Sequence, residues 1–272
     1  MNSVRVLNVE IDNLSTRELL QTLRQGVVVT PNVDHLVKLQ HDEAFMEVYR
    51  SADFRVCDSK VLLWAAKFLG QPLKEKISGS DLFPAFYEFH RHNEDIRIFL
   101  LGAREGVAAD AMRRINQKIG RDIIVDCYSP SFGFEKNEDE CAEILQKIRD
   151  SGATVLAVGV GAPKQEKFIH QYKDQLPTIK IFLAIGATLD FEAGNVKRSP
   201  KWVSEVGLEW MYRLLSEPKR LWRRYLLDDP QFFWFLVMQK LSLYQDPYKH
   251  TDSSMGLPDN PYLKEPGSVV LE

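Results

Sequence analysis

The chain has 272 residues, 44% of them hydrophobic, which is enough for a sizeable core in one large domain or two small ones. Its net charge of −3 does not favour a nucleic-acid-binding protein. The three cysteines have no Cys-x-x-Cys spacing and no histidines nearby, which argues against a zinc site and a disulfide scaffold. No window reaches the roughly 18–20 apolar residues of a membrane span. The N-terminus lacks a charged leader followed by a long apolar run, so we expect no signal peptide.

Strand-like runs alternate with helical patterns up to about residue 195. The expected strands are VRVLNVEI (4–11), VVVT (27–30), FRVCD (54–58), IRIFLLG (96–102), IIVDCYS (123–129), TVLAVGV (154–160) and IKIFLAIGA (179–187). Helices are expected after Ser15, from about Val33, over 59–70 and over 106–119. Because these strands are almost continuously apolar, the alternation predicts an α/β fold: a mostly parallel, Rossmann-like sheet with helices on both faces.

The pattern changes after Asn195, where no further strand is expected. Residues 197–224 carry eight Lys and Arg against three Glu, a net charge of +5, with Trp and Tyr between them. We therefore divide the chain into an α/β domain (1–195), a basic, aromatic-rich helical appendage (196–245) and a tail (246–272). The tail is rich in Pro, Ser, Asp and Gly, and we expect it to be poorly ordered.

Polar groups and glycines follow five of the expected strands, and ligands of open parallel sheets bind outside the carboxyl ends of the strands. They include Asn32, Asp58, Gly102, residues 159–165 and Asp190. In GVGAPKQEKF, Gly159 and Gly161 would let a ligand approach the backbone. Pro163 would pre-set the first turn of the next helix, whose N-terminus offers N–H groups to phosphate. An ordinary strand–helix turn with solvated polar residues is the alternative.

The identity of the ligand is less clear from these motifs. The Gly-x-Gly-x-x-Gly fingerprint fails because Lys164 stands at the third glycine, and there is no Walker A motif. A soluble nucleotide-dependent oxidoreductase and a non-enzymatic nucleotide-binding module are two functions that these motifs leave open. Asp58, at a strand end, would serve as a general base toward a hydroxyl or as a helix N-cap. The sequence has no Asp-x-Asp pair, so we expect no metal site and no cofactor.

Six segments, in order, resemble the WecG/TagA/CpsF family of bacterial glycosyltransferases (glycosyltransferase family 26). They are TPNVDHLVKL, VCDSKVLLWAAKFLGQPLKEKISGSDL, FLLGAREGVA, VGVGAPKQEKFI, AIGATLDFEAGNVKRSPKW and VGLEWMYRLLSEPKRLWRRYL. The similarity covers roughly residues 5–226. Gly-Ala-Pro-Lys-Gln-Glu combined with Gly-Leu-Glu-Trp-Met-Tyr-Arg-Leu is its most specific part.

The resemblance implies an inverting sugar transfer from a UDP-sugar to a sugar on a polyprenyl diphosphate, in bacterial cell-surface polysaccharide synthesis. The sugar would be of N-acetylmannosamine, mannosaminuronate or glucose type. Asp58 matches the family's proposed base, and Thr30 and Gln165 match active-site residues. The family arginine falls on Lys76, which keeps the charge but loses the bidentate fork. The residues expected to bind substrate are Asn32, Gly102, Gly159, Gly161, Glu166, Asp190, Arg213, Arg220 and Arg223.

The resemblance also gives the basic appendage a role. Helices rich in basic and aromatic residues suit an anionic membrane surface and a lipid diphosphate, although a solvated helix face remains the alternative. The enzyme is thus expected to be peripheral on the inner face of the plasma membrane, with homo-oligomerisation left open. FFWFLVM (232–238) would either pack as a helix or dip into the interface. Without a metal, the leaving diphosphate would be stabilised by helix N-termini, Lys76 or the C-terminal arginines.

Overall fold

The computed structural model describes residues 2–196, 200, 203 and 207–249, without the side chain of Arg220. Its centre is a six-stranded sheet with the order β4-β3-β8-β7-β5-β6, in which every pair of neighbouring strands is parallel. The strands are β3 (Gly26–Val29), β4 (Phe54–Arg55), β5 (Ile98–Gly102), β6 (Ile124–Tyr128), β7 (Val155–Gly159) and β8 (Ile181–Ala184). The predicted parallel α/β sheet is therefore confirmed.

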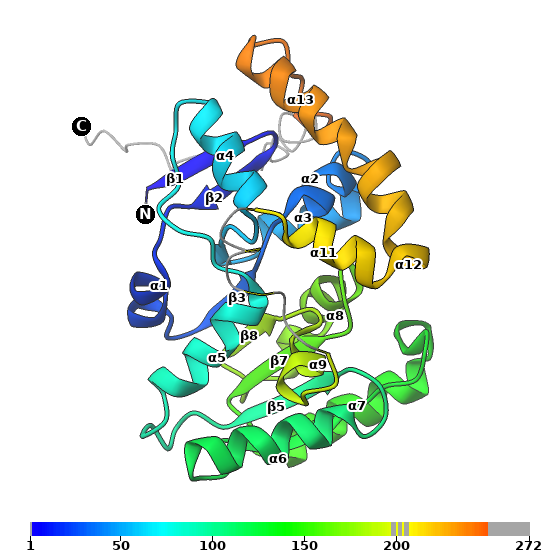
Figure 1. The fold of residues 1–272 in the computed structure, drawn as a ribbon. Helices are drawn as coiled ribbons and strands as arrows, with labels where there is room; N and C mark the ends of the chain where they lie inside the picture. Colours follow the sequence, from blue (N-terminus) through cyan, green and yellow to red (C-terminus); the bar gives the residue numbers. More distant parts are fainter. Residues whose placement is uncertain (1, 197–199, 201–202, 204–206, 250–272) are drawn as a thin grey trace, which may run out of the picture.

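Helices cover both faces of this sheet (Figure 1). One core cluster joins one face to α2 (Val33–Lys38), α3 (Glu43–Arg50), α4 (Lys60–Phe68), α7 (Glu138–Asp150) and α8 (Lys164–Tyr172). The other joins the opposite face to α1 (Thr16–Thr22), α5 (Gly79–Phe89), α6 (Val107–Ile119) and α9 (Thr188–Glu192). Along β7, Leu156 and Val158 enter the first cluster, whereas Val155 and Ala157 enter the second. Burial on both sides explains why the strands are apolar at every position.

The expectation of one continuous strand over residues 4–11 was wrong. The segment folds into a separate antiparallel hairpin of β1 (Ser3–Val6) and β2 (Val9–Asp12). Leu7 turns the chain at a positive φ of 55° and is almost completely buried. The turn is held by the core and by its neighbours, since the Leu7 amide donates to Gln239 Oε1 at 2.7 Å and Asn8 donates to the Leu39 carbonyl. The turn has no Asn-Gly or Asp-Gly pair, which is the usual sequence signal for a tight hairpin, so it was not predicted.

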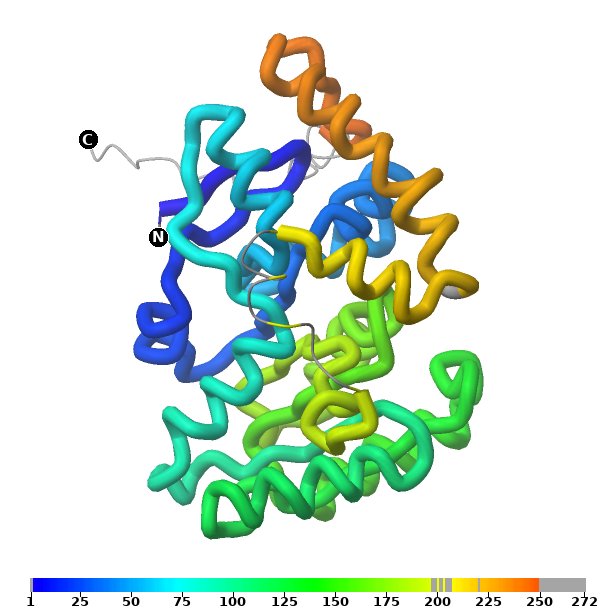
Figure 2. Tube along the Cα trace, in the orientation of Figure 1, coloured from blue at the N-terminus to red at the C-terminus, as the bar shows by residue number. Residues whose placement is uncertain are grey.

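The C-terminal segment comprises α11 (Glu209–Ser216), α12 (Pro218–Arg223), a π-helical turn (Arg224–Asp228) and α13 (Pro230–Lys240). Pro218 occupies the first position of α12, as predicted. In Figures 1 and 2 this segment, yellow to orange, runs past α2 and continues into α13, which extends beyond the sheet domain. Among the described residues, none of the helices has the length and apolar character needed to cross a bilayer.

The end of the segment returns to the N-terminal hairpin. Tyr244 donates to Gln40 Oε1 at 2.6 Å, and Arg5 pairs with Asp246 at 3.1 Å. Two of the side chains of α13, Phe232 and Leu236, join the core, so part of this helix packs as the sequence predicted. The expectation of a poorly ordered tail falls, from residue 250 onward, outside the described residues.

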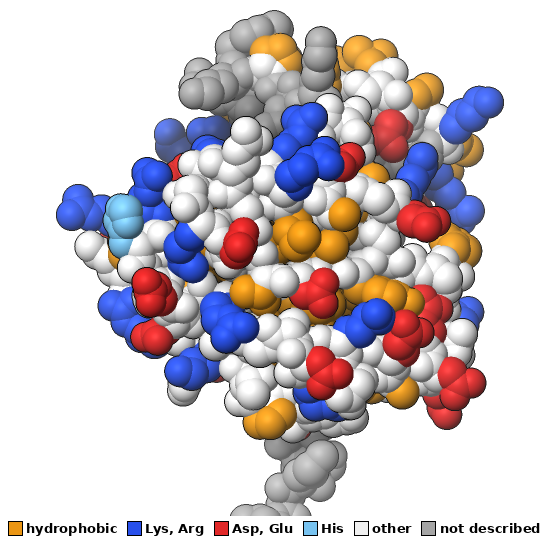
Figure 3. Space-filling model, turned by 90° about the horizontal axis from the view of Figure 1, so that it is seen from below, with side chains coloured by type: hydrophobic (Ala, Val, Ile, Leu, Met, Phe, Trp, Pro, Cys, Tyr) orange, Lys and Arg blue, Asp and Glu red, His pale blue; other side chains and the backbone are white. Residues whose placement is uncertain are grey.

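The underside of the molecule, on the side of α6, has a different surface. Figure 3 shows Lys and Arg side chains interspersed with Asp and Glu around a small central group of hydrophobic side chains. The large exposed hydrophobic side chains gather instead on the C-terminal segment. Those on α12, the π-helical turn and α13 are Trp222, Leu226, Leu227, Phe233, Trp234 and Val237.

Candidate active site

A cavity of about 350 Å³ lies between the carboxyl ends of β3 and β4 and the C-terminal segment. Its walls come from the loops after these strands, from α4 and from the C-terminal helices. The polar or charged side chains that line it are Asn32, Asp58, Ser59, Lys60, Lys76, Glu209, Arg213, Arg224, Tyr225 and Asp229. Trp64, Trp210 and Phe233 form apolar parts of the wall. The cavity therefore combines one carboxylate at a strand end with several cations and aromatic rings.

Asp58 lies three residues after Arg55, the last residue of β4. The backbone amide of Asp58 donates to the Pro31 carbonyl at 2.9 Å. The N-cap of α4 is Ser59, whose hydroxyl accepts from the Leu62 amide at 3.0 Å. Of the two roles left open for Asp58, the N-cap is thus excluded. Its carboxylate faces the cavity instead of the helix N-terminus.

Burial raises the pKa of Asp58 to about 7. Arg213 and Lys76, together with a hydrogen bond from the Asn32 side chain, act in the opposite direction, while Glu209 adds to the rise. A carboxyl group with a pKa near neutrality accepts a proton readily and is still substantially ionised at pH 7. These are the properties that a general base toward a sugar hydroxyl requires.

Lys76 and Arg213 are held beside Asp58 by one acidic residue of the appendage. Glu209 lies 3.4 Å from Lys76 Nζ and also pairs with Arg213, one helical turn further along α11. Although burial lowers the pKa of Lys76, Glu209, Asp81 and Asp58 outweigh it, so the pKa is raised and the ammonium stays charged. The two cations are suited to stabilising negative charge on a departing diphosphate.

Gln165 and Glu166 are buried beneath the strand-end loops and do not line the cavity. Gln165 Oε1 accepts from the amides of Gly186, at 3.0 Å, and Gly161, at 3.3 Å. Its Nε2 donates to Glu166 Oε1 at 2.7 Å. Gln165 therefore braces the loops after β7 and β8 against each other. Burial raises the pKa of Glu166 to about 7, and its Oε2 has no hydrogen-bond partner among the described residues.

The glycines at the strand ends permit close packing of backbone on backbone. A Cβ atom on Gly102, whose φ is +139°, would lie 2.5 Å from the Gly159 carbonyl oxygen. A Cβ on Gly159 would lie 2.8 Å from the Gly186 carbonyl oxygen. From the sequence, approach of a ligand was the reason given for Gly159 and Gly161. At Gly159 the close neighbour is the loop after β8, and at Gly102 it is the end of β7. Gly161, at φ +85°, has open space around its Cβ position.

The first turn of α8 also differs from the expectation. The helix begins at Lys164, after a cis Ala162–Pro163 bond, so Pro163 precedes the first turn. Lys164 Nζ pairs with Glu135 at 2.7 Å and lies over the Phe132 ring. Its ammonium is therefore engaged by neighbouring side chains.

The remaining candidates lie apart from the cavity lining. Thr30 is buried at the end of β3, Asp190 lies in α9, and Arg223 is exposed at the end of α12. Arg220 is in α12, but its side chain lies outside the described residues. The structure thus brings together Asn32, Asp58, Lys76 and Arg213 of the predicted set. Glu209 and Arg224 were not predicted as site residues. Glu209 is one acidic residue in a basic stretch, Arg224 directly follows another arginine, and neither pattern indicates burial in a site.

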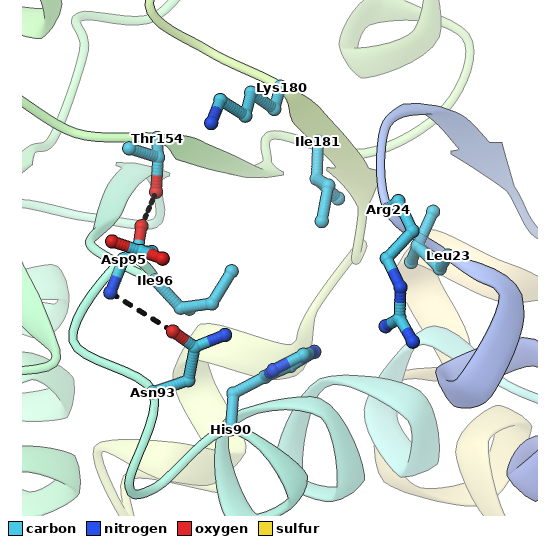
Figure 4. A pocket seen from close by; sticks show the side chains of 9 residues that line it. All are labelled: Leu23, Arg24, His90, Asn93, Asp95, Ile96, Thr154, Lys180 and Ile181. Atoms are coloured by element: carbon cyan, nitrogen blue, oxygen red, sulfur yellow. Dashed lines mark hydrogen bonds between the residues drawn. The ribbon is translucent and has the colours of Figure 1, made fainter.

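A second, smaller cavity of about 130 Å³ opens at the opposite edge of the sheet (Figure 4). Figure 4 shows Thr154 Oγ1 donating to the Asp95 carbonyl and the Asp95 amide donating to Asn93. It lies at the amino ends of the strands, away from the loops that bind ligands in such sheets. The cavity at Asp58 is therefore the candidate active site.

A metal requirement was not expected from the sequence. Within the described parts of the chain, no group of three or more His, Cys, Asp and Glu side chains is arranged to hold a metal ion. Metal-independent transfer stays a prediction.

Comparison with known proteins identifies the family of this chain. A family model described as "Glycosyl transferase WecG/TagA/CpsF family" matches residues 4–246. An N-acetylglucosaminyldiphosphoundecaprenol N-acetyl-beta-D-mannosaminyltransferase of Bacillus spizizenii is 32% identical over 222 residues, which cover 82% of each chain. The match extends over both the sheet domain and the C-terminal helices. This chain therefore belongs to the WecG/TagA/CpsF family and is a glycosyltransferase.

Proposed function

We propose that this glycosyltransferase moves an N-acetylmannosamine-type sugar from its UDP derivative to a sugar linked to a polyprenyl diphosphate, with inversion at the anomeric carbon. The single observation that carries the proposal is that the Asp58 side chain lines one cavity together with Lys76 and Arg213. Burial, which raises the pKa of Asp58 to about 7, supports it. The activity for which the Bacillus spizizenii relative is named supports the choice of sugar and of acceptor class.

The reaction needs one proton transfer and one displacement. Asp58 accepts the proton of the acceptor hydroxyl while that oxygen bonds to the anomeric carbon of the donor. The bond from this carbon to the diphosphate oxygen breaks on the opposite face, and UDP leaves with the electron pair. Lys76 and Arg213 offset the negative charge that develops on the diphosphate. Mannosaminuronate and glucose donors are the other sugars that the family resemblance allows.

The strand-end loops support a nucleotide site next to Asp58. From β3 the chain continues to β4 at one edge of the sheet, whereas β8 and the remaining strands lie on the other side of β3. In sheets of this kind, nucleotides bind in the crevice at such a topological switch point. Asn32 lies on one side of this point. On the other side, Gln165 braces the loops that contain Gly161 and Gly186. We propose that the diphosphate occupies this crevice, with Asp190 and the glycine loops toward the nucleotide.

The acceptor implies work at a membrane surface. We propose a peripheral location on the inner face of the plasma membrane, supported by the exposed Trp222, Leu226, Leu227 and Trp234 beside the basic side chains of α12. The family membership does not favour the two other classes considered from the sequence, an oxidoreductase and a non-enzymatic binding module.

The test is a donor panel with a short-chain, water-soluble GlcNAc-diphosphate lipid as acceptor. UDP-ManNAc, UDP-ManNAc uronate, UDP-glucose and UDP-GlcNAc are each incubated with enzyme, with and without EDTA, and the product is identified by mass spectrometry. We expect a β-linked ManNAc product that forms equally well in EDTA. Transfer from none of the four donors would refute the proposed function, and loss in EDTA restored by Mg²⁺ would refute metal independence.

A further inference from the structure

One arginine of the C-terminal segment lies between two buried carboxylates. Arg224 Nε is 3.6 Å from Asp34 Oδ1, on α2, and 3.8 Å from Asp229 Oδ2, at the start of α13. Asp34 and Asp229 are only 5% and 7% exposed. The cation and one carboxylate belong to the C-terminal segment, whereas the other carboxylate belongs to the sheet domain.

These contacts are longer than hydrogen bonds, so charge holds the three groups together. Among the described residues, Arg224 Nε and Asp229 Oδ1 have no hydrogen-bond partner. Asp34 has a second cation, since Lys38 Nζ lies 2.7 Å from its Oδ2. Burial raises the pKa of Asp229 to about 7, with Arg224 opposing and Asp34 reinforcing the rise. Without Arg224, the buried carboxylates of Asp34 and Asp229 would face each other between α2 and the C-terminal segment. Their repulsion would strongly disfavour the packing of this segment on α2.

The same guanidinium reaches the neighbourhood of Asp58. Arg224 Nη2 lies 3.5 Å from Asn32 Oδ1, which also accepts from the His35 amide at 3.1 Å. With its oxygen facing these donors, the Asn32 amide group can donate to Asp58. Arg224 also lies over the Tyr225 ring, 5.2 Å from its centroid, and Tyr225 packs against Trp210 in the cavity wall.

We propose that Arg224 is a positioning residue that latches the C-terminal segment onto α2 through Asp34 and Asp229, and that orients Asp58 through Asn32. The latch determines whether Glu209 and Arg213 lie over the cavity, because both are on α11, which α12 connects to Arg224. Its effect on catalysis rests on the proposed function of Asp58, but the docking itself does not.

Docking is measured by hydrogen exchange of the full chain without substrate, read by mass spectrometry over peptides of 209–240. Arg224→Ala is expected to raise exchange there about tenfold, while peptides of β5 and β7 stay as protected as in wild type and show that the sheet domain is folded. Lys219→Ala, which removes an exposed cation from the preceding helix α12, is the matched control and is expected to leave exchange unchanged.

A second variant separates the latch from ordinary packing. Asp229→Asn in the Arg224→Ala background removes one of the two opposed carboxylates and is expected to restore most of the lost protection. With the soluble acceptor, Arg224→Ala is expected to lower kcat about tenfold with KM for the UDP-sugar nearly unchanged. The double variant is expected to recover only part of this loss, because it restores docking but not the contact of Arg224 with Asn32. Wild-type exchange in Arg224→Ala, or no rescue by Asp229→Asn, would overturn the latch. Hydrogen exchange is measured without substrate. If no UDP-sugar donor is used by the enzyme, the proposed function fails, but the exchange measurement still tests the latch.

Discussion

At the scale of single residues, the chemistry depends on how the protein shifts one carboxyl group. Asp58 is followed by a serine that caps α4, and this leaves the carboxylate to the cavity. Burial raises its pKa to about 7, while Arg213 and Lys76 prevent a larger rise. A base of ordinary acidity would be ionised but weak, and one with a much higher pKa would be protonated at neutral pH. The position of the cations thus keeps the pKa of the proposed base near neutrality.

The pH dependence of kcat/KM follows from this value. The base acts only when ionised, so kcat/KM with a soluble acceptor should rise with pH and reach half of its plateau near pH 7. Glu166 and Asp229 also have pKa values raised to about 7, so the assignment needs a control. In Asp58→Asn the residual rate should lose this dependence. If the variant keeps the same half-point, another group is the one that titrates.

The strand-end glycines make a separate prediction about stability. Gly102→Ala places a Cβ 2.5 Å from the Gly159 carbonyl oxygen at a φ of +139°. Strain and overpacking together should lower the free energy of unfolding by roughly 2–5 kcal/mol. Gly106→Ala is the matched control, since its φ is +79° but its Cβ would meet nothing within 4 Å. Urea denaturation should find Gly102→Ala much the less stable of the two, and equal stabilities would contradict the close approach of β5 and β7.

At the scale of secondary structure elements, α11 completes the site that the sheet begins. Glu209 in its first turn connects Lys76 of the sheet domain with Arg213. The helix is amphipathic, yet none of its residues is fully buried. Its position therefore depends on ion pairs and on the Arg224 contacts more than on a core of its own. This arrangement explains how a helix with little buried apolar surface is held close to Asp58.

Arg213→Ala tests this element. The variant removes one of the two cations near Asp58 and leaves Lys76 as the other. Transfer to the soluble acceptor should therefore fall about 10²-fold. Arg213→Lys keeps a charge on the same helix and should retain more activity than the alanine variant. Since no membrane is present, full activity of Arg213→Ala in this assay would limit the arginine to lipid binding.

Prediction from the sequence worked where local signals and tertiary structure agree. The apolar strands, the helix that begins after Ser15, and Pro218 at the start of α12 all follow from short-range patterns. The turn at Leu7 was missed because the core and Gln239, over 230 residues away, hold it. Asp58, Lys76 and Asn32, which line one cavity in the structure, were predicted as site residues from strand ends and the family resemblance. Glu209, Arg224 and Asp229 were not, because their roles depend on where a distant helix docks.

At the scale of the whole molecule, the surface divides into two kinds. The underside in Figure 3 mixes charges of both signs, as a solvated surface does. The C-terminal segment instead exposes large apolar side chains, with Trp234 64%, Leu226 57% and Leu227 55% exposed. Such a patch next to basic residues is typical of a membrane-binding surface. The active site lies between this segment and the sheet, so membrane binding would bring the cavity to its lipid-linked acceptor.

Vesicle binding tests this division. The triple variant Leu226→Ser, Leu227→Ser and Trp234→Ala should bind anionic phospholipid vesicles at least about tenfold more weakly. Each substitution removes apolar surface that would be buried in the lipid interface. Transfer to the soluble acceptor should change little. Phe132→Ala, at an exposed aromatic of the loop before the 3₁₀ turn Phe134–Lys136, is the control. Undiminished vesicle binding by the triple variant would show that this surface is not the one that contacts lipid.

The most direct test of the account is the rate of sugar transfer by Asp58→Asn with the soluble acceptor, measured beside UDP binding. The substitution keeps the size of the side chain and removes the base. We predict a fall of about 10²-fold or more in transfer while UDP binds as before. Asp53→Asn, whose exposed carboxylate accepts from the Val27 amide near the other end of β4, should transfer normally. Near-normal turnover by Asp58→Asn would contradict the assignment of Asp58 as the base.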